Sequence, residues 1–380
     1  MPTRLEFSTA TRILFGPGTI SELPALASAF GGTALIVTGS NQSRAKHHLS
    51  SINAQYFPIP GEPTVSLIRE GAQLALESHC HYIIGFGGGS AIDAAKAIAA
   101  IAPNSGEPMD YLEVIGQARP LENPPLPFLA VPTTAGTGAE VTRNAVIGSP
   151  EHSVKASIRS PLMLARLALI DPNLTLNLPP QITATTGLDT ITQLIEPYVS
   201  CRANALTDIY CLDGLTRAIT ALPRAYANGS DTDARSEMSF ASLLSGLSLA
   251  NAGLGAVHGF AAPLGGMLNA PHGALCAAVL PHATAINIRA LRQRQPQHAS
   301  LAKYARIAHL LTGGEAIPEA CIDSLTQLSK SLQIPTLRTL GLTQADIPAA
   351  VERAAAASSM KANPLPLTTA ELTEILERAL

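Results

Sequence analysis

One carboxylate, one amide and two imidazoles stand at spacings that suit a divalent metal ion. Asp189 and Gln193 are four residues apart in a helical stretch, so their side chains share one helix face. His258 and His272 lie in a glycine-rich segment, and Pro271 prevents a single helix from spanning both. Oxygen donors combined with two imidazole nitrogens suit Fe²⁺ or Zn²⁺. These four residues are the predicted metal ligands, although a single histidine on an apolar stretch is more often an ordinary core residue.

A glycine-rich turn further upstream predicts a site for a dinucleotide. Gly87, Gly88, Gly89 and Ser90 follow an apolar strand and open an apolar helix that carries Asp93. Successive glycines let backbone N–H groups approach an anion, and the start of the helix adds partial positive charge for a phosphate. The spacing matches neither a Walker loop nor the usual GxGxxG fingerprint. A tight turn that binds no ligand is the competing interpretation.

A second loop, rich in hydroxyl groups, follows the next apolar strand. Thr133, Thr134 and Thr137 could donate hydrogen bonds to phosphate or ribose oxygens. Loops of Ser, Thr and Gly are common turns in themselves, so the position of this loop matters more than its composition. In an open parallel sheet, ligands bind beyond the carboxyl ends of the strands, where this loop is predicted to lie.

The first strand-to-helix turn bears on the choice of nicotinamide coenzyme. Gly39, Ser40 and Asn41 form this turn, which lacks an acidic residue. An Asp or Glu at such a turn holds the ribose 2′-OH and excludes a 2′-phosphate. The turn therefore favours NADPH over NADH, with Arg44 as a further candidate donor, unless it accepts either coenzyme.

Alternating strands and helices in the first half of the chain position these turns. Apolar runs predict buried strands at residues 33–38, 82–86, 128–132 and 167–171, and the spacing of apolar residues predicts a helix at 65–78. Such alternation predicts a parallel sheet with right-handed crossovers.

The second half of the chain is predicted to be helical. Long helical patterns begin at about residue 181, for example at 205–222 and 236–250, and prolines between residues 171 and 180 mark the junction. We therefore predict an α/β domain at residues 1–178 and an all-α domain at residues 179–380.

The composition excludes several classes of protein. The 380 residues are 46% hydrophobic and 14% charged, with a net charge of -3 and no basic block, which argues against a nucleic-acid partner. Neither a run of about 18 uncharged apolar residues nor a signal peptide is found, so we expect no membrane association. The five cysteines are scattered without a CxxC pair, which favours a reducing cytoplasm over a disulfide framework.

The motifs, taken in order, resemble those of a known family. The glycine turn reads GGGSAIDAAK at residues 87–96, the threonine loop reads PTTAGTGAEVT at 132–142, and a PHG motif contains His272. Over nearly its whole length the chain resembles the iron-containing (group III) alcohol dehydrogenases, within the superfamily that also includes glycerol dehydrogenase and dehydroquinate synthase.

The resemblance implies a Rossmann-like domain, a helical domain of the dehydroquinate synthase type, and an active site in the cleft between them. It implies hydride transfer between NAD(P) and a small alcohol or aldehyde, assisted by a metal, in a homodimer or larger homo-oligomer. Asp189, His258 and His272 match three of the four metal-ligand positions, and both histidines and Lys155 are candidate catalytic residues. By matching position, the cofactor contacts are Gly87, Gly88, Gly89, Ser90, Asp93, Thr133, Thr134, Thr137 and Lys155.

Two positions depart from the family pattern and leave alternatives open. Gln193 stands at the ligand position where histidine is usual, and Ala262 replaces a further histidine near the substrate. One alternative is a metal-independent reductase, similar to maleylacetate reductases, in which His258 and His272 act directly on the substrate. Another is a catalytically weak nucleotide-binding protein. Cys276 is expected to be a core residue.

Overall fold

The computed structural model describes residues 5–152, 154–314 and 316–380, which form two compact units. The sheet unit comprises Ser8–Thr134 and Gly138–Leu176. The helical unit comprises Asn177–Leu380 together with residues 5–7 and Ala135–Thr137. The predicted combination of a parallel-sheet domain with an all-α domain is confirmed.

A parallel sheet, six-stranded within the described residues, forms the centre of the sheet unit in the order β1-β8-β5-β4-β2-β3. Its inner strands are buried on both faces, which explains their continuous apolar runs. A separate antiparallel hairpin, β6–β7, completes the strands. The bounds are β1 Ile13–Phe15, β2 Thr33–Gly39, β3 Ala54–Ile59, β4 Cys80–Gly87, β5 Phe128–Pro132, β6 Asn144–Ser149, β7 Val154–Arg159 and β8 Leu167–Ile170.

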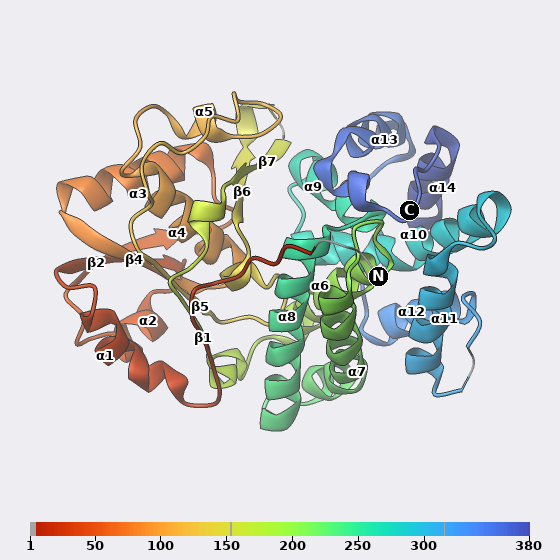
Figure 1. Ribbon diagram of the computed structural model, residues 1–380, viewed down its shortest axis with the longest axis horizontal. Helices are drawn as coiled ribbons and strands as arrows, with labels where there is room; N and C mark the ends of the chain where they lie inside the picture. The colour runs from red at the N-terminus through yellow and green to blue at the C-terminus, as the bar shows by residue number, and fades with distance from the viewer. Residues whose placement is uncertain (1–4, 153, 315) are drawn as a thin grey trace. The chain divides into compact units, whose positions relative to one another are not determined.

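Helices cover both faces of this sheet, as Figure 1 shows. Helices α1 (Leu23–Ser28) and α2 (Ser43–His48) contribute to an apolar cluster with one face. Helices α3 (Val65–Glu77) and α4 (Gly89–Ile101) lie over the other, and a short helix, α5 (Pro108–Tyr111), follows.

The strands predicted from apolar runs are β2, β4, β5 and β8, and the predicted helix is α3. The pattern did not predict the hairpin strands β6 and β7, nor the sheet strands β1 and β3, which lie at the two edges of the sheet. An edge strand is short or half-exposed, and β3 also contains Pro58, which an edge position tolerates because one side of the strand needs no partner.

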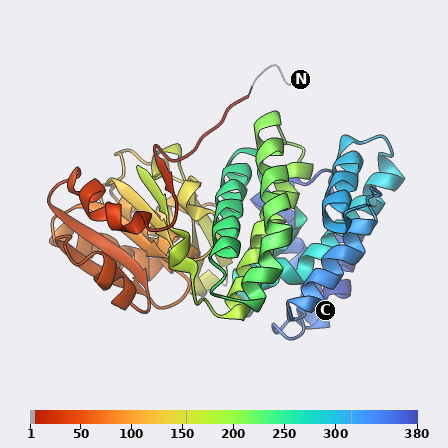
Figure 2. The ribbon, with the colours of Figure 1, turned by 90° about the horizontal axis from the view of Figure 1, so that it is seen from below.

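The helical unit surrounds one buried helix, α6, which packs against α7, α8 and α10. Figures 1 and 2 show the long helices α7 and α8 side by side. The bounds are α6 Pro180–Val199, α7 Ala205–Ala227, α8 Thr232–Ala252, α9 Ala256–Leu268, α10 His272–Arg294, α11 Ala299–Thr312, α12 Ala320–Ser331, α13 Ile347–Ala356 and α14 Thr369–Ala379.

Helix α10 is the one described helix whose length and mean hydropathy would suit a membrane span. Of the apolar window in this helix, 83% is buried inside the structure. Helices α8 and α9 pass the same test only as a pair, and they are bent by 98° at the break between them. Core helices commonly have these properties, so the test is weak grounds for a membrane span.

Candidate functional site

One face of α6 carries three polar side chains into the interior of the helical unit. Asp189, Gln193 and Glu196 are separated by four and three residues, so all three lie on the same face of the helix. Each is buried. A buried carboxylate is costly unless it is paired, so the partners of Asp189 and Glu196 indicate what this face is for.

Glu196 places His258 at the start of α9. Its Oε1 accepts a hydrogen bond from the backbone N of Val257 (2.7 Å), and its Oε2 lies 2.7 Å from His258 Nδ1. Asn363 Oδ1 accepts from the preceding N–H, that of Ala256, at 3.1 Å. These contacts satisfy N–H groups that the first turn of a helix leaves unpaired. With Nδ1 held by Glu196, the other ring nitrogen of His258 faces Asp189.

A glycine brings the start of α10 against α6. A Cβ on Gly273 would lie 2.7 Å from the carbonyl oxygen of Thr185, so only glycine permits this approach. The approach positions His272, the first residue of α10, beside Asp189. Cys276, one helical turn later, lies on the same face as His272 and is fully buried.

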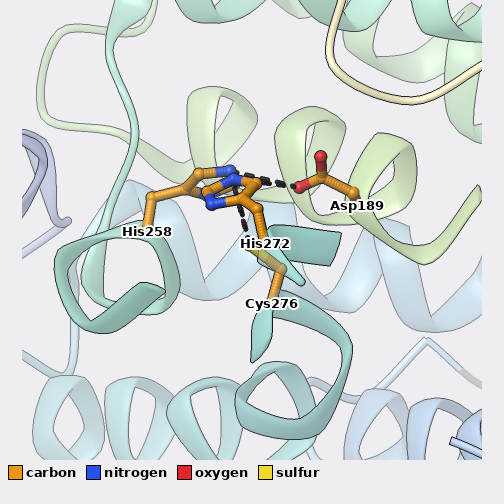
Figure 3. Close-up of side chains that lie close together, drawn as sticks. All are labelled: Asp189, His258, His272 and Cys276. Carbon is orange, nitrogen blue, oxygen red and sulfur yellow. Dashed lines mark hydrogen bonds and ion pairs between the residues drawn. The ribbon is translucent and has the colours of Figure 1, made fainter. Parts of the chain in front are cut away.

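Asp189, His258, His272 and Cys276, which we name the histidine cluster, place one potential donor atom each within 4.8 Å of one another (Figure 3). Asp189 Oδ1 lies 3.3 Å from His258 Nε2 and 3.8 Å from His272 Nε2. Although it is buried, this oxygen has no hydrogen-bond partner of standard geometry among the described residues. A cation at the centre of the cluster would satisfy it, so the residues present fit a divalent metal.

The charges within the histidine cluster are strongly coupled. Burial opposes ionisation of Asp189, but the nearby His272 and His258 hold the pKa of its carboxyl below the usual value. Burial likewise disfavours a charge on His258, yet Cys276, Asp189 and Glu196 raise its pKa well above the ordinary value. Burial raises the pKa of the Cys276 thiol to about 12, despite the nearby His258. The opposite shifts of Asp189 and His258 both reflect the attraction between a carboxylate and a cationic group at this point of the cluster.

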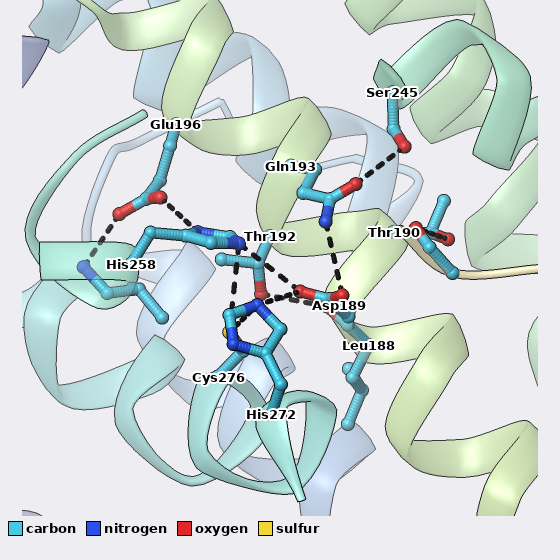
Figure 4. Close-up of polar contacts among 12 residues, drawn as sticks. Leu188, Asp189, Thr190, Thr192, Gln193, Glu196, Ser245, His258, His272 and Cys276 are labelled. Carbon is cyan, nitrogen blue, oxygen red and sulfur yellow. Dashed lines mark hydrogen bonds and ion pairs between the residues drawn. The ribbon is translucent and has the colours of Figure 1, made fainter. Parts of the chain in front are cut away.

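Gln193 lies beside the cluster but directs both ends of its amide to other groups (Figure 4). Its Nε2 donates to Asp189 Oδ2 at 3.1 Å, and its Oε1 accepts from Ser245 Oγ at 2.9 Å. The amide therefore fixes the carboxylate of Asp189 from the side opposite the two imidazoles. That Gln193 is itself a metal ligand stays a prediction.

In the sheet unit, the three turns predicted to bind the coenzyme follow the carboxyl ends of neighbouring strands. Thr38 of β2 is level with Phe86 of β4, and Gly87 of β4 is level with Pro132 of β5, so the carboxyl ends of these parallel strands coincide. The turns that follow contain the predicted residues Gly39, Ser40, Asn41, Gly87, Gly88, Gly89, Ser90, Thr133 and Thr134.

Helix α4 begins at the glycine turn with its first N–H groups available to a ligand. Its N-cap is Gly88, and no side chain of the described residues caps the helix there. Uncapped N–H groups and the helix dipole together favour an anion such as a phosphate. The prediction that Gly87 to Ser90 bind the pyrophosphate fits this geometry and stays a prediction.

One local contact and one long-range contact hold the turn after β2 and the start of α2. Asn41 Oδ1 accepts a hydrogen bond from Ser43 N (2.9 Å) at the start of α2. The Arg44 guanidinium donates to the carbonyl oxygen of Leu174 at 2.6 Å. The guanidinium of Arg44 has further N–H donors, so its predicted contact with a 2′-phosphate stays a prediction, as do those of Gly39, Ser40 and Asn41 with the coenzyme ribose.

Asp93 belongs to a second buried group of charges, which we name the lysine cluster: Asp93, Lys96 and Glu140. Lys96 Nζ donates to Ala139 O (2.8 Å), Thr142 Oγ1 (2.9 Å) and Asn144 O (2.7 Å), and it lies 3.5 Å from Asp93 Oδ1. Asp93 Oδ2 accepts from Val146 N at 3.0 Å. Asp93 thus joins α4 to β6, and its predicted contact with a coenzyme stays a prediction.

Two further predicted residues, Lys155 and Thr137, belong to neither cluster. Lys155 is on β7, where its Nζ lies 3.3 Å from Glu62 Oε1. Thr137 belongs to the segment Ala135–Thr137, which packs with the helical unit: the neighbouring Gly136 O accepts from Thr190 Oγ1 at 3.1 Å. The predicted roles of Lys155 and Thr137 toward the coenzyme are not decided by these contacts.

Two residues of the site were not predicted from the sequence. Glu196 was missed although its spacing from Asp189 places it on the same helix face, and Cys276 was expected to be ordinary core. The spacing of four residues from His272 to Cys276 was the available signal, since it equals the spacing that singled out Asp189 and Gln193.

Comparison with known proteins agrees with this arrangement along nearly the whole chain. The family model described as iron-containing alcohol dehydrogenase matches residues 10–172. The model of the C-terminal region of the Fe-containing alcohol dehydrogenase family matches residues 183–380. The two matches correspond to the sheet unit and the helical unit.

Similar proteins include alcohol dehydrogenase 4 of Saccharomyces cerevisiae, 34% identical over 86% of this chain and 83% of the relative. The NAD-dependent methanol dehydrogenase of Bacillus methanolicus is 31% identical over 97% of both chains. A crystal structure of a 1,3-propanediol oxidoreductase is 32% identical, covers 99% of this chain and 100% of that one, and superposes with a TM-score of 0.89. The chain therefore belongs to the iron-containing alcohol dehydrogenase family, and it is an oxidoreductase that acts on CH–OH groups.

Proposed function

We propose that the protein is an NAD(P)-dependent dehydrogenase of small alcohols, acting in the reverse direction as an aldehyde reductase, with a divalent metal at Asp189, His258 and His272. The observation that carries the proposal is the buried Oδ1 of Asp189, which lacks a hydrogen-bond partner among the described residues and faces both imidazoles. A satisfied core carboxylate would leave no such atom.

The chain's own residues would prepare the site for this chemistry. A bound metal would supply Lewis acidity toward the substrate oxygen, and a bound nicotinamide would supply or accept the hydride. Glu196 holds His258 by Nδ1 and so leaves Nε2 to coordinate. Gln193 holds Oδ2 of Asp189 and leaves Oδ1 to coordinate. The first N–H groups of α4 would bind the coenzyme phosphates.

Several finer parts of the proposal come from the sequence. The relatives' names mention methanol and 1,3-propanediol, which supports a small alcohol as substrate. The side chain of Ala262 has no exchangeable proton, so protons would pass through the coenzyme ribose and water, with Lys155 nearby. A homo-oligomer and a cytoplasmic location are part of the same proposal.

Removal and return of the metal test the function directly. The full-length protein, purified without nickel, is dialysed against a strong chelator and then reloaded with Zn²⁺ or Fe²⁺ without oxygen. Oxidation of NADH and NADPH by a panel of short aldehydes is followed, with metal content measured by mass spectrometry. Turnover should disappear with the metal and return with it. Undiminished kcat in metal-free protein would overturn the metal-assisted mechanism. Coenzyme binding without turnover of any aldehyde would overturn the proposed reductase activity.

A single substitution tests the preference for NADPH. A side chain at Gly39 would meet open space, and the backbone there has no positive φ, so Gly39→Asp can be made without strain. The new carboxylate should lower kcat/KM for NADPH at least about 10-fold relative to NADH, because like charges repel the 2′-phosphate. Gly39→Asn is the uncharged control of the same size. Equal losses with both coenzymes would show that this turn does not contact the 2′-position.

A further inference from the structure

Cys276 presents its sulfur to the same point as the other members of the histidine cluster. Its Sγ lies 3.7 Å from His258 Nε2 and 3.5 Å from His272 Nε2. The thiol is completely buried, and both imidazoles direct the same kind of nitrogen toward it (Figure 3). A thiol has a single proton, so it can donate to only one of these nitrogens. This arrangement is unusual for a cysteine that merely fills the core.

Four of the six separations among the donor atoms match the edges of a tetrahedral metal site. Bonds of about 2.0–2.3 Å from a central ion give tetrahedron edges of roughly 3.3–3.8 Å. The edges from Asp189 Oδ1 to the two Nε2 atoms are 3.3 and 3.8 Å, and those from Cys276 Sγ are 3.7 and 3.5 Å. The two remaining separations are within 4.8 Å. The donor atoms are therefore already arranged for coordination.

Gln193, which stands at the family's histidine position, is poorly placed to complete this set. The amide nitrogen faces Asp189 and carries no lone pair for a metal, while the amide oxygen accepts from Ser245. To coordinate through its oxygen, Gln193 would have to turn its amide over and give up the hydrogen bond to Asp189 inside a buried region. Cys276 needs no such rearrangement.

We infer that the Cys276 thiolate is the fourth protein ligand, so that the metal centre is Asp189, His258, His272 and Cys276 and is selective for zinc. The inference rests on the proposed function, because it assigns the ligands of the same metal, to which the substrate oxygen would be added as a fifth ligand. Binding of M²⁺ forms the metal–sulfur bond and releases the thiol proton to solvent, with no change of oxidation state. A soft sulfur ligand in a tetrahedral set favours Zn²⁺ over Fe²⁺.

The zinc absorption edge of the unaltered, zinc-loaded protein gives the first test. Extended fine structure should show one sulfur at about 2.3 Å together with nitrogen or oxygen ligands at about 2.0–2.1 Å. A shell made only of nitrogen and oxygen would overturn the inference. Because this measurement needs no variant, it does not depend on whether a substituted protein folds.

Variants and Co²⁺ spectroscopy give the second test. In the Co²⁺-loaded protein, a thiolate ligand produces a charge-transfer band in the near ultraviolet. Cys276→Ser should abolish this band and weaken Zn²⁺ binding by about 100-fold or more, since even a residue behind a ligand is worth 10–100-fold. Cys211→Ser is the matched control, because Cys211 is another buried free thiol of the helical unit outside the cluster. Gln193→Ala should retain the band.

The outcomes separate this inference from the proposed function. Two outcomes would overturn the role of Cys276 while leaving an active, metal-dependent enzyme. The first is a metal coordination shell without sulfur, and the second is a charge-transfer band that is lost in Gln193→Ala and kept in Cys276→Ser. Chelator-treated protein that contains no metal yet turns over aldehyde at full rate overturns the metal-assisted function, and the inference with it. One metal-bound sulfur that disappears only in Cys276→Ser supports both.

Discussion

Each unit contains one buried group of ionisable residues, and the two groups differ in how completely their hydrogen bonds are made. In the lysine cluster, the three N–H donors of Lys96 meet Ala139 O, Thr142 Oγ1 and Asn144 O. In the histidine cluster, Asp189 Oδ1 has no hydrogen-bond partner of standard geometry among the described residues, although it is just as deeply buried. Lys96 and Asp189 are equally buried, but hydrogen-bond satisfaction distinguishes them.

We infer from this difference that the lysine cluster stabilises the fold, and we propose that the histidine cluster binds a ligand. A buried ion whose hydrogen bonds are complete joins elements, as Lys96 joins α4 to the segment that leads into β6. A buried acceptor without a hydrogen bond raises the free energy of the folded protein, and a ligand that pairs with this acceptor would recover that cost. Substitutions in the two clusters should therefore affect different measurements, and each prediction below separates them.

The largest expected effect is on catalysis, from Asp189→Asn. The substitution keeps the volume of the side chain but removes the charge that faces both imidazoles, so kcat/KM should fall by about 10³-fold or more, which corresponds to several kcal/mol of lost metal assistance. Metal content should fall with it, while the circular dichroism spectrum of the metal-free protein stays unchanged. If the variant kept both metal and turnover, Asp189 Oδ1 would have no role in metal binding or catalysis.

Lys96→Met should instead act on stability. The substitution leaves three acceptors and Asp93 without their cation, which costs about 3–5 kcal/mol in the free energy of unfolding. Denaturant titration gives this value, and metal content per folded chain serves as the control, since it should remain at the wild-type level. Loss of less than about 1 kcal/mol would mean that the satisfied cluster contributes little to the fold.

The lysine cluster also predicts a pH dependence of stability. Burial raises the pKa of Glu140 from 4.5 to about 7. The folded protein therefore holds this proton more tightly than the unfolded chain, so the stabilisation is complete below about pH 4.5 and is lost as the pH rises through about 7. A difference of 2.5 pKa units corresponds to at most about 3 kcal/mol.

Glu140→Gln should remove that dependence. Between pH 5 and pH 8, the wild-type free energy of unfolding should fall more than that of the variant, by up to about 3 kcal/mol. Denaturant titrations of both proteins at the two pH values give the comparison. Parallel changes in the two proteins would show that Glu140 is ionised in the folded state across this range.

The smallest expected effect is from Glu196→Gln, beside the histidine cluster. The amide can still accept from Val257 N, but it loses the charge that orients His258 through Nδ1. Metal affinity or kcat should fall about 10- to 100-fold, as for other residues that support metal-bound histidines. The control is His309→Ala on α11, which should change neither quantity. An unchanged Glu196→Gln enzyme would mean that packing alone orients His258.

The sequence predicted the backbone of this molecule better than its side-chain contacts. The inner strands β2, β4, β5 and β8 have apolar runs that only a doubly covered parallel strand requires, so they were predicted with their turns. The edge strands β1 and β3 carry weaker patterns, because one side of an edge strand needs neither burial nor a partner.

Side-chain direction could not be read from spacing alone. Asp189 and Gln193 on α6, and His272 and Cys276 on α10, have the same separation of four residues. In the first pair the second residue turns toward Ser245, and in the second pair it faces the imidazoles. The deciding partners come from α8 and α9, far away in the sequence, so no local pattern contains them.

The capping of α9 by Asn363 bears on how the protein is made in a cell. The two capping partners, Ala256 and Asn363, are 107 residues apart. At about 5–20 residues per second, a ribosome needs roughly 5–20 s to synthesise that interval. For most of this time the nascent chain contains both imidazoles and the thiol, but the turn that orients His258 lacks one of its caps. We therefore expect the histidine cluster to reach its final arrangement late in biosynthesis, after most of the helical unit has been translated.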